Sequence, residues 1–344
     1  MEINSCSSCG GRVEYSPKHK ALMCVNCGNL YNIEFKRDNQ KHPIGWTPDN
    51  AKLNKWSLGN KSYECRTCGA QITFNRFDIA NSCQYCNTSS LIPLKDLPGL
   101  MPEVVIPFKI AKNDAKSEFY SRIKKRKFLP RTFKRNLPRT DIGSTYISSF
   151  TFACDVVATY SGTRSVSKTV RASDGRSRTV TEYESFSGKI EKYFDNIVVE
   201  ASDKLSQNEI TEIYPYNFAE SYDYDDDFVK GYNVGYYNQS VEDAEYTAKK
   251  EALQAIERSI RSKYSSIVSL KINPTYSNIV YNYALLPVYF INFNYKNKSY
   301  TNVMNGQTGA LAGKVPRSAL QIAGLILFII TVIGLFGLGI FSML

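Results

Sequence analysis

Eight of the nine cysteines constrain the fold of this 344-residue sequence more than any other feature. They form two C-x2-C-x14-C-x2-C patterns, and each cysteine of the second pattern follows its counterpart by 59 residues. This internal duplication predicts one small structural unit that is built twice. The eight residues are Cys6, Cys9, Cys24, Cys27, Cys65, Cys68, Cys83 and Cys86.

The spacing of these cysteines predicts metal binding. A C-x-x-C pair places two sulfurs on one tight turn, and two such pairs supply the four ligands of a tetrahedral zinc site. We therefore predict two Zn²⁺ ions per chain, with all eight cysteines as ligands. Because no ligand position would stay open, both ions are expected to be structural and not catalytic. Disulfides and iron–sulfur clusters are the alternatives, and the identical spacing and an expected cytosolic setting favour zinc.

The residues that flank the cysteines agree with this prediction. A zinc knuckle needs a residue that tolerates a positive φ directly after the second cysteine of each pair. Gly10, Gly28 and Gly69 occupy three of these positions, and Asn87 occupies the fourth. Residues 12–15 and 71–74 alternate polar and apolar side chains, which predicts hairpin strands.

The predicted fold class is α+β, with two N-terminal zinc ribbons, a central antiparallel α+β domain and one C-terminal transmembrane helix. The linkers are recognised by their prolines and glycines. The expected boundaries are 1–39 for ribbon 1, 40–62 for a linker, 63–95 for ribbon 2, 100–313 for the α+β domain and 318–344 for the tail anchor.

Two helices are predicted in the α+β domain. Residues 113–127 begin at Asn113 as a candidate N-cap, and residues 240–263 begin at Ser240, which forms a capping-box-like pair with Asp243. Alternating patterns predict half-buried strands, and Cys154 is expected to be a core residue of the first. The expected strands are 150–160, 179–186, 195–201, 267–272, 280–293, 298–304 and 307–311. A Ser/Arg/Gly-rich loop that forms a mobile hairpin is expected at 161–178, and a two-residue turn at Asn305-Gly306.

The C-terminus is strongly apolar. Residues 318–344 contain no charged side chain, and Lys314 and Arg317 directly precede them. A helix of residues 322–344 would be about 34 Å long, compared with about 30 Å for a hydrocarbon core. The sequence therefore predicts a single-pass tail anchor in the lipid bilayer of the cell membrane, with the N-terminal region in the cytoplasm.

The positive charge is concentrated in one segment. The whole chain has a formal charge of +11, and residues 109–139 alone carry +10. Residues 1–95 carry +5, which falls to about +1 when two Zn²⁺ ions are bound by eight thiolates. The basic residues of 122–139 form either a solvated surface or a contact for an anionic partner, which is lipid or nucleic acid.

The sequence contains no recognisable catalytic motif. Residues 305–314 have the wrong glycine spacing for a phosphate-binding loop, and Val315 stands where Ser or Thr would bind Mg²⁺. His19 and His42 are the only histidines, and we interpret both as surface polar residues. The acidic residues of 220–227 do not match a calcium loop, and a solvated loop or a patch facing the basic segment is expected.

Nearly the whole chain resembles a family of bacterial double zinc-ribbon proteins with one C-terminal span. Members of this family often carry helicase or primosome names, although their activity is undefined. Besides the ribbons, the resemblance rests on residues 105–109, 128–130, 133–134, 284–289 and 304–309. Asn87 departs from the usual knuckle glycine. The resemblance implies architecture and location, but no reaction.

These observations favour a membrane-tethered binding or scaffold protein that is not an enzyme. The ribbons are expected to present a rigid surface to a cytosolic protein partner. The alternative is a membrane-held nucleic-acid-binding protein that uses the ribbons and residues 122–139. The low charge of zinc-loaded ribbons disfavours this alternative, because a nucleic-acid-binding module is normally strongly basic.

Overall fold

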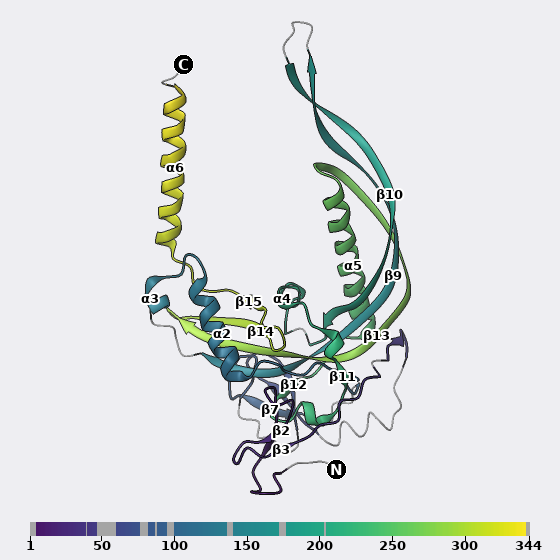
Figure 1. Cartoon of the computed structure of the whole chain (residues 1–344), viewed down its shortest axis with the longest axis vertical. Coiled ribbons are helices and arrows are strands. Elements are labelled where there is room, and N and C mark those ends of the chain that lie inside the picture. The colour runs from purple at the N-terminus through teal and green to yellow at the C-terminus, as the bar shows by residue number, and fades with distance from the viewer. Residues whose placement is uncertain are drawn as a thin grey trace.

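The computed structural model describes residues 5–341, apart from 39, 47–59, 76–81, 87, 95–99, 136–139, 172–176 and 203. Side chains are described for these residues except at 60, 73–75 and 334–341. Sheet dominates the structure (Figure 1). Asn87 and residues 136–139 of the basic segment, which the sequence analysis considered, lie outside the described residues.

Three very long strands form the frame of the molecule. β9 (Asp141–Arg171) pairs antiparallel with β13 (Ile267–Tyr295) on one side and with β10 (Ser177–Glu200) on the other. Their distal halves form a curved arm that extends away from the body (Figure 1). The strands predicted at 150–160, 179–186, 195–201, 267–272 and 280–293 fall within these three strands, apart from residue 201, but their lengths were underestimated. The predicted loop at 161–178 is wrong where the structure describes it, because residues 161–171 and 177–178 are strand, whereas the expected hairpin is present as the antiparallel pair of β9 and β10.

The main sheet is mixed, which corrects the expected antiparallel domain. β8 (Val104–Val105) runs parallel to β13, and β12 (Asn233–Gly235) runs parallel to β9. Each parallel pair joins segments that are far apart in the chain and have only two or three residues in the shorter strand. Such short strands carry no alternation pattern that a sequence could reveal.

The second four-cysteine unit contributes strands to the same sheet. β5 (Asn60–Cys65) pairs with β6 (Gln71–Asn75) and with β7 (Leu91–Leu94), and β6 pairs with β12. The first unit instead forms its own three-stranded sheet. Its strands are β1 (Val13–Ser16), β2 (Ala21–Cys24) and β3 (Leu30–Tyr31).

Short strands complete the edges of the main sheet. β14 (Lys298–Asn305) pairs with β13 and with β15 (Leu311–Gly313), β11 (Tyr222–Asp223) pairs with β8, and β4 (His42–Pro43) pairs with β13. The predicted two-residue turn at Asn305-Gly306 is wrong, because Asn305 ends β14 and β15 begins only at Leu311. The Asn305 amide is buried, and its Oδ1 accepts the N–H groups of Gln307 and Thr308.

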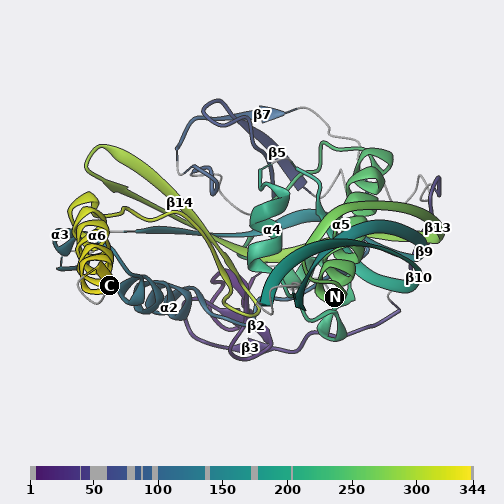
Figure 2. The ribbon, with the colours of Figure 1, turned by 90° about the horizontal axis from the view of Figure 1, so that it is seen from above.

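The helices cover the sheet at separate places (Figure 2). α5 (Val241–Lys263) begins at the predicted N-cap Ser240 and packs its apolar face on the arm. α2 (Lys112–Lys125) buries Ala115, Phe119 and Ile123 as expected, but its N-cap is Ala111 and not Asn113. The shorter helices are α3 (Arg131–Arg135), α4 (Gln207–Ile213) and the 3-10 helices η1 (Phe218–Glu220) and η2 (Asp226–Phe228).

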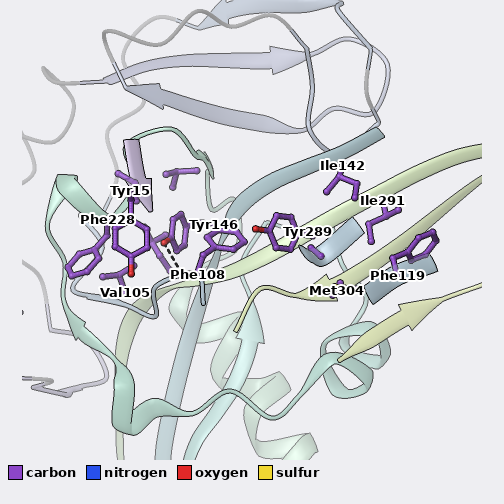
Figure 3. Packing of buried hydrophobic residues seen from close by; sticks show 14 of the residues in the cluster. Tyr15, Val105, Phe108, Phe119, Ile142, Tyr146, Phe228, Tyr289, Ile291 and Met304 are labelled. Atoms are coloured by element: carbon purple, nitrogen blue, oxygen red, sulfur yellow. Dashed lines mark hydrogen bonds between the residues drawn. The ribbon is translucent and has the colours of Figure 1, made fainter. Parts of the chain in front are cut away.

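One core cluster joins the first cysteine unit to the body of the molecule. Figure 3 shows a row of buried side chains that runs from Tyr15 in β1, past Phe108 and Tyr146, to Phe119 in α2. The Phe108 ring stacks on Tyr232 at 4.5 Å and also contacts Tyr289 at 4.8 Å. The first unit is therefore fixed to the sheet through aromatic packing.

The C-terminal helix α6 (Ala319–Phe341) projects from the body beside α3 (Figure 1). Its exposed apolar side chains include Leu320, Leu327 and Phe328. Over the part of the chain that the structure describes, no helix meets the length and apolarity that a membrane crossing requires. This finding contradicts the predicted transmembrane tail anchor at 318–344 and the cell-membrane location inferred from it. Residues 342–344 of that prediction lie outside the described residues.

Candidate metal centres

The first cluster brings together the four sulfurs that the sequence singled out in ribbon 1. Cys6 and Cys9 precede β1, whereas Cys24 ends β2 and Cys27 follows it. The Sγ atoms of Cys6 and Cys27 lie 3.5 Å apart, and so do those of Cys9 and Cys24. All four ligand atoms lie within 4.8 Å of one another, so this group could hold one metal ion.

The second cluster repeats this arrangement 59 residues later. The Sγ atoms of Cys65 and Cys86 lie 3.6 Å apart, and those of Cys68 and Cys83 lie 3.7 Å apart. These four sulfurs also lie within 4.8 Å of one another and could hold a second ion. In each cluster the first and third cysteines are buried, and the other two are more exposed.

The turns around the sulfurs have the predicted knuckle geometry. Gly10, Gly28 and Gly69 have φ values of 68°, 76° and 65°. Each donates its N–H to the carbonyl of the first cysteine in its pair, at 2.8 to 3.0 Å. Only residues that tolerate the left-handed region close such turns without strain, which explains why glycine stands there.

The sulfur geometry agrees with a tetrahedral ion. Four sulfurs at about 2.3 Å from one Zn²⁺ lie about 3.8 Å from each other at the corners of a tetrahedron. The measured separations of 3.5 to 3.7 Å are close to this value. A thiolate set of this shape fits Zn²⁺, and the backbone turns already hold the ligands in place.

Electrostatics within the clusters also favours a cation. The Tyr31 hydroxyl donates to Cys6 Sγ at 3.3 Å, and this hydrogen bond is the largest influence that lowers the pKa of the Cys6 thiol to about 5. Burial raises the pKa of Cys83 and raises that of Cys86 to about 11. The four thiols of a cluster therefore do not all ionise at neutral pH by themselves. A divalent cation would stabilise the four thiolates together.

Two polar contacts at the clusters could not be found from the cysteine spacing. Tyr31 lies in β3, and its hydroxyl contacts both Cys6 and the backbone N–H of Ser7. The Lys204 ammonium donates to the carbonyl of Cys68 at 3.1 Å. Tyr31 belongs to the first cysteine unit. Lys204 lies more than a hundred residues after Cys68 in the chain, so its position in the sequence does not indicate this contact.

The other candidate residues do not join the metal clusters. Cys154 is buried in β9, as predicted. His42 is not a simple surface residue, because its ring stacks on Trp46 at 3.6 Å and its Nε2 lies 2.7 Å from Glu103. In the acidic segment, Glu220 pairs with Lys109, the first cation of the basic segment 109–139, and Asp227 pairs with Lys230.

The basic segment is largely exposed where the structure describes it. Arg122 pairs with Glu118, and Arg126 donates to the carbonyl of Gly313 at 3.2 Å. The remaining described cations of residues 122–135 are solvent-exposed. They are Lys124 and Lys125 in α2, Lys127 shortly after it, and Arg131, Lys134 and Arg135 in α3.

Comparisons with known proteins identify one curated relative at low identity. The chain is 27% identical to the uncharacterised protein YdjG of Bacillus subtilis (strain 168) over 324 residues, which cover 92% of this chain and 91% of that protein. No family model matches the chain. No solved structure matches it either.

Proposed function

We propose that this chain is a zinc protein without enzymatic activity, in which two structural Zn²⁺ ions stabilise a surface that binds a protein partner. The observation that carries this proposal is the pair of four-sulfur groups with near-tetrahedral separations. Cysteine supplies all four ligands in each, so substrate or water would find no open position. Membership of the double zinc-ribbon family forms part of the same proposal.

The first zinc ribbon offers a surface for a partner. Val25 lies between Cys24 and Cys27, and Leu30 begins β3, and both side chains are 47% exposed. Apolar side chains that a rigid turn holds in solvent are suited to bury against another protein. The aromatic contacts of Tyr15 with Phe228 and Tyr232 hold this ribbon on the body and keep the surface in place.

The experiment that tests the proposal measures metal and partner binding in the same protein. Elemental analysis of the purified full-length chain is expected to find two zinc ions per chain. Partner binding is measured by affinity capture before and after chelation, with the captured protein identified and then purified. We expect a Val25→Asp/Leu30→Asp double variant to keep both zinc ions and lose the partner.

The matched control is Val268→Asp, which places a carboxylate at an exposed valine of β13, in the arm. This variant is expected to retain the partner. A zinc content below about one ion per chain would refute the metal part of the proposal. Partner binding that survives both chelation and the ribbon double variant would refute the role of the ribbons.

Nucleic-acid binding is the second candidate, and the exposed cations of α2 and α3 favour it. A protein that neutralises several phosphates loses affinity steeply as salt rises. Binding of an oligonucleotide that weakens at least about a hundredfold between 50 and 200 mM salt would support this candidate. The low net charge of zinc-loaded residues 1–95 is the reason to rank it second.

A further inference from the structure

A cavity of about 720 Å³ lies where α3, the β13–β14 turn and the segment leading into α6 come together. Figure 1 shows α3 beside the foot of α6. The described walls of the cavity carry four basic side chains, one or two from each of the three segments. They are Arg131 from α3, Lys296 and Lys298 from the turn region, and Arg317 from the segment before α6.

The four cations line one cavity that has no acidic side chain in its described lining. All four side chains are exposed. Among the described residues, none of the four has a carboxylate within ion-pair distance. Four like charges around one cavity repel each other, and an anion between them would remove this repulsion.

The walls of the cavity are held in place before any ligand binds. Lys296 and Asn297 form a two-residue turn with φ values of 48° and 59°, which fixes the directions of the strands that carry Lys296 and Lys298. Thr132 and Tyr295 share a hydrogen bond of 2.8 Å between α3 and β13. A preorganised site loses little conformational freedom when it binds.

The third wall is attached in the same way. The N–H of Ser318 donates to the carbonyl of Phe128 at 2.7 Å, which connects the residue after Arg317 to the segment before α3. The Phe133 ring packs against Tyr295 at 5.0 Å and brings α3 onto β13. The segments that carry the four cations are therefore held together at one corner of the molecule.

We propose that this cavity binds a compact ligand that carries two phosphate groups. A phosphate monoester carries a charge of about −1.5 to −2 at neutral pH, so two of them balance the four cations. Arginine matches phosphate oxygens with two parallel hydrogen bonds, and lysine adds a mobile point charge. The cavity volume lies within the range of about 300–1,000 Å³ that is usual for small-ligand sites.

A compact ligand fits the observations better than a polynucleotide. A polymer backbone is normally bound by a basic groove that follows it. Here the four cations surround one cavity, and the exposed lysines at the end of α2 do not line it. The same phosphate chemistry occurs in soluble bisphosphates and in phosphoinositide headgroups, and the test separates these two sources. The inference is independent of the zinc sites and of the protein partner.

The test titrates the purified full-length protein with inositol 1,4-bisphosphate by calorimetry, and with phosphatidylcholine vesicles that contain phosphatidylinositol 4-phosphate by co-sedimentation. The variant is Lys298→Gln/Arg317→Gln. The matched control is Lys271→Gln/Arg171→Gln, which removes the same two charge types at exposed positions of β13 and β9 outside the cavity lining.

We expect the affinity for the bisphosphate or the vesicles to fall at least about tenfold for each cation removed from the cavity. The control is expected to bind like the unmodified protein. Binding of the free bisphosphate indicates a soluble ligand, whereas binding of the vesicles alone indicates a phosphoinositide headgroup. Either result supports a phosphate-binding site in the cavity. Equal affinities for the variant and the control would overturn the proposal. Absence of binding to both probes would overturn it as well. So would a single-stranded oligonucleotide that binds more tightly than either probe and loses this affinity in the variant.

Discussion

Replacing Tyr15 by Ala tests whether aromatic packing fixes the first cysteine unit to the body. Tyr15 is only 4% exposed, and its ring contacts Phe228 at 5.8 Å and Tyr232 at 6.4 Å. Both partners belong to the segment that runs from η2 to the start of β12. The backbone supports the same contact, because the N–H of Tyr15 donates to the carbonyl of Lys230 at 3.0 Å.

The expected effect follows from the buried area. An aromatic side chain removes about 150–250 Å² from water, which corresponds to an upper bound of about 4–6 kcal/mol at about 25 cal/mol/Å². Large-to-alanine changes at buried aromatic residues remove about 3–5 kcal/mol. We therefore expect the Tyr15→Ala variant to lose about 3–4 kcal/mol of the free energy that holds the first unit on the body.

Urea denaturation and hydrogen exchange measure this loss. In the variant, the amides of β1 and of residues 228–232 should exchange faster, while the second unit keeps its protection. The zinc content should stay at two ions per chain, since Tyr15 contributes no ligand. The control is Tyr246→Ala, which removes a tyrosine that is 75% exposed on α5.

Two results would refute this reasoning. If Tyr15→Ala and Tyr246→Ala change the stability by the same small amount, below about 1 kcal/mol, the packing does not hold the unit. If the zinc content of Tyr15→Ala falls to one, the ring stabilises the metal site itself and not its attachment.

Replacing Cys83 by Ser should lower the zinc content, measured by elemental analysis, from two ions per chain to one. The control Cys154→Ser changes a buried cysteine outside both clusters and should leave the content at two. Two ions in the Cys83 variant would contradict the ligand assignment. Replacing Lys109 by Met should destabilise the protein at pH 7 by at most about 1 kcal/mol, because the pair with Glu220 is partly exposed. The hydrogen bond from Lys109 is the main cause that lowers the pKa of the Glu220 carboxyl. A carboxyl with a lowered folded-state pKa stabilises the fold above its unfolded pKa, and this contribution is lost as the pH falls through the folded pKa. Urea midpoints of the two proteins should therefore converge as the pH falls below the lowered pKa of Glu220, and a difference that persists in acid would exclude this ion pair as the cause.

Local features of the structure were predictable because the residues that carry them are close in the chain. The knuckle glycines require a positive φ, and that requirement depends only on the turn in which they stand. Ser240 caps α5 through the N–H of Asp243, three residues later. The buried face of α2 follows from the helical spacing of Ala115, Phe119 and Ile123.

The lengths of the three long strands were not predictable from the same patterns. The first part of β10, residues 177–183, is exposed on both faces, so burial imposes no alternation of apolar and polar side chains there. In β13, Pro274 suggests an interruption, yet it pairs with Ala158 in a part of the strand that has no second partner strand among the described residues. Proline is tolerated at such an edge because no neighbour there needs its missing N–H.

Residue preferences for turns predicted one two-residue turn that does not exist and missed one that does. Asn305-Gly306 has the sequence of a hairpin turn, but the Asn305 amide donates to the carbonyls of Ile213 and Pro215 and is needed in the core. The two-residue turn lies instead at Lys296-Asn297, where lysine is an unusual residue for a positive φ. Tertiary contacts of a buried polar side chain thus outweighed a strong local preference.

The two cysteine units show why equal metal chemistry need not have equal structural consequences. Both have the same ligand spacing and similar sulfur separations, so spacing alone makes them equivalent. The first unit has its own small sheet and depends on the packing of side chains such as Tyr15. The second unit continues the main sheet, because Val234 of β12 pairs with Thr73 of β6 and also with Tyr146 of β9. Loss of the ion from the first unit should therefore unfold or detach that unit alone. Loss of the ion from the second unit should also destabilise the long strands of the main sheet.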